Sequence, residues 1–86
     1  MEFEFDVRKS RSNKKKHGID FVEAQRPWDD PDVIVIPART ADEPRFLIVG
    51  MIEQEHWSGI ITPRGERVRI ISVRRSREEE IELYEG

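Results

Sequence analysis

Four short apolar runs between residues 33 and 73 constrain the fold most. They are rich in β-branched residues and separated by turn residues, as β-strands are: VIVI (33–36), RFLIVGMI (45–52), WSGIIT (57–62) and RVRIISV (67–73). The links at 53–56 and 63–66 are short, and the second contains Pro63 and Gly65. A parallel connection needs a crossover of a dozen or more residues. The sequence therefore predicts a four-stranded antiparallel meander.

The last of these runs departs from simple alternation. In a regular strand, Val68 and Ile70 would point to one side of the sheet, whereas Ile71 and Val73 would point to the other. Two explanations remain open. Either both faces of the sheet are covered here, or a bulge of one residue reverses the alternation.

The beginning of the chain predicts a short strand followed by a helix. EFEFD (2–6) alternates polar and apolar residues around Phe3 and Phe5, which indicates a half-buried strand. Asp6 is a good N-cap for a helix that runs to His17, and Gly18 suits the left-handed position that ends a helix. This helix has almost no apolar face, so its outward side chains are either solvated or functional.

A second, shorter helix is predicted directly afterwards. Asp20 and Glu23 have the spacing of a capping box at its start. Pro27 disfavours helical geometry at the residue before it, so we expect the helix to end at Arg26.

A closing helix is predicted from about Ser76 to Tyr84. Ser76 and Glu79 have capping-box spacing, and an acidic first turn complements the helix dipole. Ile81 and Tyr84 lie one turn apart and give this helix a face to dock.

Charge is segregated along the chain, although the formal net charge is only −3. Residues 8–17 contain six cations and no acid, and residues 64–77 contain six arginines and only Glu66. Residues 78–86 contain five glutamates and no basic residue. Two basic blocks that meet on one surface are typical of phosphate binding, whereas each block alone is more often a solvated face.

The first basic block forms a stripe on the predicted first helix. Lys9, Asn13 and Lys16 or His17 recur at helical spacing. Lysines and an amide suit phosphate and sugar contacts, and a histidine beside lysines suits proton transfer. The alternative is that His17 caps the helix end and the lysines only solvate it. We expect the helix to lie beside the sheet, with this stripe facing the same cleft as Arg69.

The second basic block lies on the last predicted strand. Arg67 and Arg69 share a face, and Arg74 and Arg75 straddle the strand end. Guanidinium groups bind phosphate in a bidentate manner and stabilise a phosphoryl transition state. The alternative is ion pairing with the glutamates at 78–82, which we expect to engage at least one arginine.

Several other classes of protein are disfavoured. The chain has no cysteine, no recognised metal-ligand spacing, no glycine-rich phosphate loop and no serine elbow. It has neither a signal peptide nor an apolar run long enough for a membrane helix, so we expect a cytoplasmic protein without cofactors. The length of 86 residues predicts a single domain over residues 1–86.

Nearly the whole chain resembles the BrnT toxins of bacterial type II toxin–antitoxin modules. RFLIVG (45–50) matches the central strand of that family, and Arg77 occupies its usual serine or threonine cap position. The opening motif of the family is similar to Asp6, Lys9, Asn13, KHG (16–18), Phe21, Glu23 and Ala24. Its closing motif is similar to RIIS (69–72), Arg74, Arg75, Glu80 and Tyr84.

The resemblance implies an α+β fold similar to RelE toxins and a ribonuclease activity. It also implies a small ribbon-helix-helix antitoxin, BrnA-like, as the partner in a hetero-oligomer, and we expect this partner to cover the basic surface.

Our first hypothesis is an endoribonuclease that needs no metal and arrests growth. In this hypothesis the substrate's 2′-hydroxyl attacks the adjacent phosphate. The residues that stabilise the pentavalent centre are Arg67, Arg69, Arg74 and Arg75. The candidates for phosphate contact and proton transfer are Lys9, Lys16, His17 and Tyr84, with Asn13 and Arg64 as further RNA contacts. The alternatives are a non-catalytic nucleic-acid-binding module and an inert interaction domain.

Overall fold

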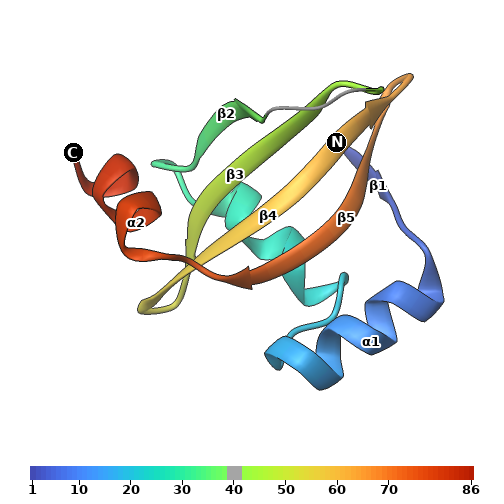
Figure 1. Cartoon of the computed structure of the whole chain (residues 1–86), viewed down its shortest axis with the longest axis horizontal. Coiled ribbons are helices and arrows are strands. Elements are labelled where there is room, and N and C mark those ends of the chain that lie inside the picture. Colours follow the sequence, from blue (N-terminus) through green and yellow to red (C-terminus); the bar gives the residue numbers. More distant parts are fainter. Residues whose placement is uncertain (39–41) are drawn as a thin grey trace.

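The computed structural model describes residues 1–38 and 42–86, and within them the chain has an α+β fold (Figure 1). A mixed sheet of five strands is accompanied by two α-helices and one 3-10 helix. The elements are β1 (Glu2–Glu4), α1 (Val7–His17), η1 (Glu23–Asp29), β2 (Ile34–Ala38), β3 (Arg45–Ile52), β4 (Glu55–Arg64), β5 (Arg67–Arg75) and α2 (Glu78–Glu85).

The sheet has the strand order β1-β5-β4-β3-β2. β2 to β5 pair antiparallel in sequence order, whereas β1 lies parallel to β5, with Glu2 opposite Arg67 and Glu4 opposite Arg69. The expected four-stranded antiparallel meander is therefore only part of a five-stranded mixed sheet. The parallel pair is possible because almost the whole chain separates β1 from β5 and serves as the crossover.

A β-bulge on β5 resolves the irregular alternation of its sequence. Ile61 is opposite Ile70, but Ile60 is opposite Ser72, so Ile71 has no partner on β4. The extra residue returns Val73 to the same face as Ile70, and both are almost completely buried. Of the two explanations left open by the sequence, the bulge is the one observed.

The third and fourth strands of the meander are longer than predicted. β4 extends through Pro63 and Arg64, and only Gly65 and Glu66 form the turn to β5. Gly65 has a φ of +62°, a left-handed conformation that glycine adopts without a steric penalty. The tighter turn brings Arg64 directly opposite Arg67.

The hydrophobic core lies on one face of the sheet, against the segment that follows α1. Its buried residues are Ile19, Phe21, Ala24, Ile48, Trp57, Ile61, Ile70 and Val73. Phe21 and Ala24 follow α1 in the chain. Apolar packing therefore holds the segment directly after α1 in place, and not α1 itself.

The second helix is a 3-10 helix that continues past its predicted end. We expected it to end at Arg26, but η1 runs through Pro27 to Asp29. The fixed φ of proline is compatible with 3-10 geometry, and the Pro27 carbonyl accepts a hydrogen bond from the Asp30 N–H at 3.0 Å. Pro27 also packs on Gly50 of β3, where an added Cβ atom would lie 2.9 Å from the Pro27 Cβ.

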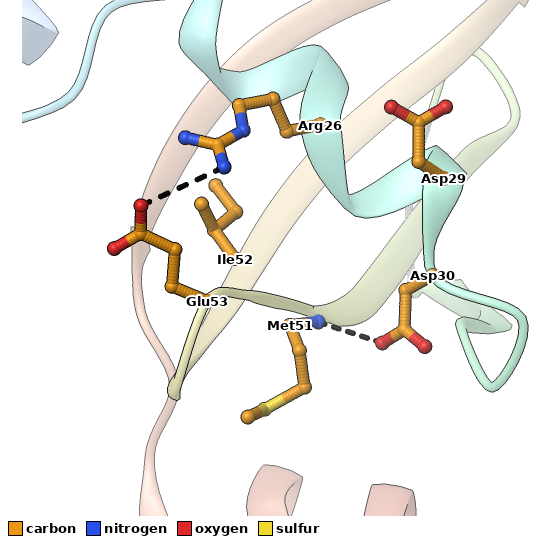
Figure 2. A pocket seen from close by; sticks show the side chains of 6 residues that line it. All are labelled: Arg26, Asp29, Asp30, Met51, Ile52 and Glu53. Atoms are coloured by element: carbon orange, nitrogen blue, oxygen red, sulfur yellow. Dashed lines mark hydrogen bonds and ion pairs between the residues drawn. The ribbon is translucent and has the colours of Figure 1, made fainter.

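Polar contacts join the end of η1 to the end of β3 (Figure 2). The Met51 N–H donates to Asp30 Oδ2 at 2.8 Å, and Arg26 forms an ion pair with Glu53 at 3.8 Å. These contacts hold η1 across the sheet.

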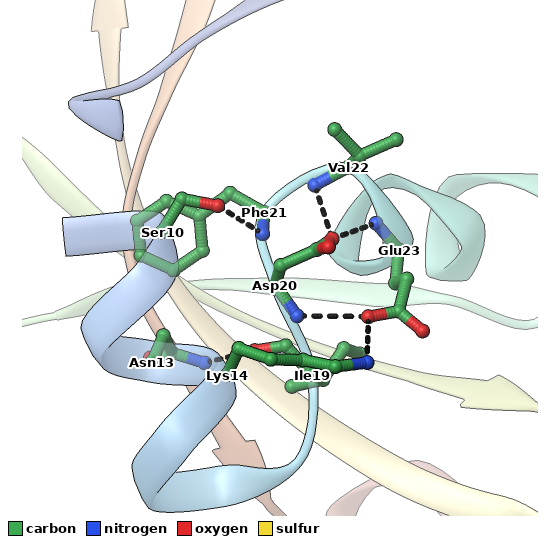
Figure 3. Close-up of polar contacts among 8 residues, drawn as sticks. All are labelled: Ser10, Asn13, Lys14, Ile19, Asp20, Phe21, Val22 and Glu23. Carbon is green, nitrogen blue, oxygen red and sulfur yellow. Dashed lines mark hydrogen bonds and ion pairs between the residues drawn. The ribbon is translucent and has the colours of Figure 1, made fainter. Parts of the chain in front are cut away.

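Polar side chains, not apolar ones, dock α1 on the rest of the molecule (Figure 3). Ser10 Oγ accepts the Phe21 N–H at 2.9 Å, and the Asn13 amide donates to the Ile19 carbonyl at 2.9 Å. Lys14 Nζ lies 2.7 Å from Glu23 Oε1. Val7, the only large apolar residue of α1, is exposed. The position of α1 therefore depends on hydrogen bonds.

The predicted caps at the beginning of the chain are present. Asp6 accepts from the N–H groups of Arg8 and Lys9, and Gly18 ends α1 in the left-handed conformation with a φ of +80°. Asp20 and Glu23 also form the reciprocal capping-box contacts, at 2.8 and 3.0 Å.

The last helix begins one residue later than its predicted cap. Its N-cap is Arg77, whose N–H donates to Glu80 Oε1 at 2.8 Å, so the cap pair is not Ser76 and Glu79. Ser76 instead continues the pairing of β5 with β4: its N–H donates to the His56 carbonyl at 3.1 Å, and its Oγ lies 2.7 Å from Ser58 Oγ.

Candidate functional site

A polar pocket of about 210 Å³ lies between α1 and β5. One wall consists of side chains from α1, and the other consists of Ile71 and Ser72 at the bulge of β5. Its lining residues are Lys9, Ser12, Asn13, Lys16, His17, Phe21, Ile71 and Ser72. The predicted stripe on the first helix thus lines one pocket beside the sheet, as expected, but Arg69 is not among its lining residues.

The pocket exists because β1 covers only part of the edge of β5. β1 pairs with residues 67–69, and α1 then lies along the remainder of the strand. Asn13 bridges the two elements: its Oδ1 accepts the Val73 N–H at 3.2 Å, while its Nδ2 donates to the Ile19 carbonyl. Both polar atoms of this buried side chain are thus engaged within the protein, and Asn13 anchors the pocket wall.

The cations of α1 are largely without acidic partners. Among the ion pairs between described residues, only Lys14 of this helix takes part, through Glu23. The hydrogen bond from Glu23 raises the pKa of Lys14, which keeps it charged. The lysines at the pocket, Lys9 and Lys16, are exposed and unpaired within the described part of the chain. The rim of the pocket therefore has two lysines that form no ion pair with a described residue.

The Asp6 carboxylate is influenced by the charges of one pocket lysine and one arginine of β5. The pKa of Asp6 is lowered, first by the Lys9 and Arg8 N–H groups and then by the charges of Lys9 and Arg69. One carboxylate thus lies within electrostatic range of both cations.

The arginines at the β4–β5 turn lie on the face of the sheet opposite the core, and each has an acidic neighbour. Glu4 forms ion pairs with Arg64 at 3.9 Å and with Arg69 at 3.8 Å, and Glu2 pairs with Arg67 at 3.9 Å. These distances are too long for hydrogen bonds, so the three guanidinium groups are neutralised only loosely.

Arg74 is held tightly by α2. Its two terminal nitrogens bind the two carboxylate oxygens of Glu80, both at 2.8 Å, and Ser58 also donates to Glu80. The Arg74 hydrogen bond is the main cause that lowers the pKa of Glu80 from 4.5 to about 2. The expectation that glutamates of the last helix engage at least one arginine is confirmed.

Arg75 and Tyr84 also have partners within the protein. Arg75 binds Glu55 at 2.6 Å, and its guanidinium lies 5.5 Å from the centre of the Trp57 ring. The Tyr84 hydroxyl donates to Asp30 Oδ2 at 2.6 Å, which raises the pKa of Tyr84 to about 12. α2 lies apart from α1 in the molecule (Figure 1), and Tyr84 is not among the lining residues of the pocket.

The structure therefore brings together some of the predicted site residues and separates the others. Lys9, Asn13, Lys16 and His17 share the pocket, whereas Arg64, Arg67 and Arg69 form a second group and Arg74, Arg75 and Tyr84 lie toward α2. Sequence reasoning missed Ser12 and Ser72 as lining residues. Ser12 follows Lys9 at helical spacing and could have been found, but Ser72 depends on the bulge.

Within the described part of the chain, no group of three or more histidine, aspartate or glutamate side chains could hold a metal ion. The same residues include no helix that is both long and apolar enough to span a membrane.

Comparison with known proteins identifies the family. No curated protein matches the chain. The family model described as the ribonuclease toxin, BrnT, of type II toxin–antitoxin systems matches residues 5–80, which include α1, the whole sheet from β2 onward and the cap of α2. The chain therefore belongs to the BrnT family of ribonuclease toxins.

Proposed function

We propose that the protein is a metal-independent endoribonuclease that cuts RNA at the pocket between α1 and β5. One observation supports this assignment most: Lys9, Lys16 and His17 line the same pocket, and both lysines lack a carboxylate partner among the described residues. Cations that the protein does not neutralise are available for phosphate.

The proposed reaction needs only the substrate and side chains. The 2′-oxygen of one nucleotide bonds to the adjacent phosphorus, and the bond from phosphorus to the 5′-oxygen breaks. A base takes the 2′-hydroxyl proton, and an acid returns a proton to the leaving oxygen. The products are a 2′,3′-cyclic phosphate and a 5′-hydroxyl. His17 is the proton-transfer residue in this scheme, because it supplies an imidazole to the lining of the pocket.

The lysines stabilise the extra negative charge of the pentavalent phosphate. Arg69 is the arginine of β5 that we assign to the same phosphate or its neighbour, because its charge and that of Lys9 both act on Asp6. Arg64 and Arg67 lie on the same face as Arg69 and serve as further RNA contacts. Arg74, Arg75 and Tyr84 fall outside the proposed site, because carboxylates within the protein engage them.

A toxin of a type II system has an antitoxin protein as its partner. We assign this role to a ribbon-helix-helix protein that forms a hetero-oligomer with the toxin and blocks its basic surface. Cleavage of cellular RNA by the unbound toxin would arrest growth. The proposal also retains the similarity to RelE toxins that the sequence predicted.

The test is cleavage of single-stranded RNA in the presence of a chelator, with analysis of the product ends. We expect cyclic phosphate ends, and a strand with 2′-O-methyl groups should resist cleavage. Lys9→Gln and Lys16→Gln should each slow cleavage. The Arg45→Gln variant is the control, because Arg45 is an exposed cation paired with Glu43 outside the pocket.

The possible failures have distinct meanings. Loss of cleavage on chelation would contradict the metal-independent mechanism. RNA binding without cut products would indicate a non-catalytic nucleic-acid-binding module, and absence of both would indicate an interaction domain.

A further inference from the structure

A second cationic surface of α1 lies outside the pocket. We call Arg8, Arg11 and Lys15 the outer ridge: they are spaced i, i+3 and i+7 and therefore share one face of the helix. All three are exposed, and none lines the pocket. The buried side chains of α1, Ser10 and Asn13, project from the opposite side, so the ridge faces solvent.

The outer ridge has no acidic partner among the described residues. This distinguishes it from the arginines of β5 that are paired with Glu2, Glu4, Glu55 and Glu80. Three adjacent like charges repel one another, and an anionic ligand would remove that repulsion.

We infer that the outer ridge binds the phosphate backbone of RNA next to the nucleotides in the pocket. The inference rests on the proposed function and adds a docking site to it. The ridge would hold the RNA strand and take no part in the chemical step, since it touches neither the scissile phosphate nor the pocket.

The position of the ridge suits one continuous strand. Lys9 and Lys16 lie on the adjoining face of the same helix, so positive charge extends from the pocket around α1 to the ridge. From Arg8 to Lys15 the ridge is about 10 Å long, at about 1.5 Å per helical residue. A dinucleotide held in the pocket would leave the ridge unoccupied, whereas a longer strand would reach it.

The chemistry of the ridge favours nucleic acid over protein. Phosphate backbone contacts need only cations, whereas the centre of a protein interface is enriched in aromatic side chains, and the ridge contains none. α2, which lies apart from α1, exposes Glu78, Glu79, Glu82 and Glu85 (Figure 1). These acids repel phosphates and so direct an RNA strand toward α1.

The first experiment measures binding without cleavage. The triple variant Arg8→Gln, Arg11→Gln, Lys15→Gln is titrated with a 2′-O-methyl oligonucleotide at several salt concentrations. Three lost contacts to a single strand should lower the slope of log K against log salt by about 2. The control variant Arg26→Gln, Arg45→Gln, Arg77→Gln removes the same charge from exposed residues outside α1 and should keep the wild-type slope.

The second experiment separates docking from chemistry. For a long RNA, the ridge variant should have a KM raised by about tenfold at moderate salt and an unchanged kcat. For a dinucleotide, both constants should equal those of the wild type. The melting temperature should not fall, because none of the three side chains forms an ion pair or a side-chain hydrogen bond with another described residue.

Several outcomes would overturn the inference. These are an unchanged salt slope, an equal loss in the control variant, or no binding of the oligonucleotide by the wild type. The ridge variant could instead keep the wild-type slope of log K against log salt for the oligonucleotide but lose affinity for a polyglutamate peptide. The ridge would then be a protein-docking surface. A wild type that binds with a steep slope but never cuts would refute the proposed function and leave the ridge inference intact.

Discussion

The lysines of α1 and the arginines of β5 form similar basic blocks in the sequence, but in the structure they differ in how many acidic partners they have. β5 and its turn lie beside acidic residues from β1, β4 and α2, which pair with Arg67, Arg69, Arg74 and Arg75. On α1, only Lys14 has such a partner among the described residues. A dense block of positive charge in a sequence is therefore not the same as available positive charge.

The physical reason lies in the surroundings of each element. β5 is flanked by β1 and β4, so its side chains face those of the strands on either side, and Glu2 and Glu4 are directly opposite Arg67 and Arg69. α1 contacts the rest of the molecule along one side only, and its other faces meet solvent. The comparison predicts that chemistry depends on α1, whereas several arginines of β5 serve stability.

The largest expected effect is the loss of cleavage on replacing His17. His17→Ala should lower kcat by about a hundredfold or more, because it removes the proposed proton-transfer group. Its melting temperature should stay near that of the wild type, since His17 is exposed. Initial rates on RNA, with Arg45→Gln as the control, would check this. Full activity of His17→Ala would place the chemistry elsewhere.

Arg74→Ala should destabilise the fold by about 3 kcal/mol, because it leaves the Glu80 carboxylate buried without its bidentate partner. Arg75→Ala is the matched control: its pair with Glu55 is exposed, and its loss should cost less than about 1 kcal/mol. Urea unfolding of both variants measures the difference.

At temperatures where Arg74→Ala remains folded, it should cleave RNA at near the wild-type rate. The role that the sequence predicts for Arg74, stabilisation of the pentavalent centre, requires the reverse: loss of activity with the fold nearly intact. A stable but inactive Arg74→Ala protein would mean that Arg74 takes part in catalysis. The chemistry would then depend on β5 as well as on α1.

Asn13→Ala tests whether hydrogen bonds hold α1 in its position on β5. The change leaves the Val73 N–H and the Ile19 carbonyl without their partner, at a cost of about 2 kcal/mol. Because α1 would shift on β5, cleavage should fall as well, whereas the neighbouring Ser12→Ala should leave stability unchanged. Thermal melts and initial rates provide the readouts. An Asn13→Ala protein with normal stability would mean that apolar packing, rather than hydrogen bonds, docks α1.

The pH dependence of stability provides a test of the Glu80 contact. The folded-state pKa of Glu80 is lowered from 4.5 to about 2, so its contribution is fully present above about pH 4.5 and is lost as the pH falls toward 2. Other carboxylates also titrate in this range. The measurement is therefore the difference in unfolding free energy between the wild type and Glu80→Gln, which should shrink on acidification. A constant difference would contradict the Arg74 pairing.

The smallest expected effect is that of Tyr84→Phe. Removing the hydroxyl breaks the hydrogen bond to Asp30 and should cost about 1 kcal/mol, without a change in cleavage. Because the folded-state pKa of Tyr84 is raised to about 12, its contribution persists below about pH 10 and is lost above it. Ultraviolet absorbance titration would follow the ionisation. A strong loss of cleavage in this variant would bring α2 into the active site.

Local features of this protein could be predicted from the sequence because neighbouring residues produce them. The caps at Asp6 and Gly18 depend on short-range hydrogen bonds and on backbone freedom, and they define α1 correctly. The strands follow from β-branched runs between turn residues. The lysine–histidine stripe follows from helical spacing, so Lys9, Lys16 and His17 could be placed on one surface in advance.

Tertiary structure alone decided which of these features became a site. The parallel pairing of β1 joins residues from the two ends of the chain and supplies the acids beside Arg67 and Arg69. The bulge at Ile71 directs the Val73 N–H toward Asn13. The sequence predicted that Asn13 contacts RNA, but this hydrogen bond makes it an anchor of α1 on β5. Such outcomes depend on contacts between residues far apart in the sequence, and local periodicity contains no information about which partners will meet.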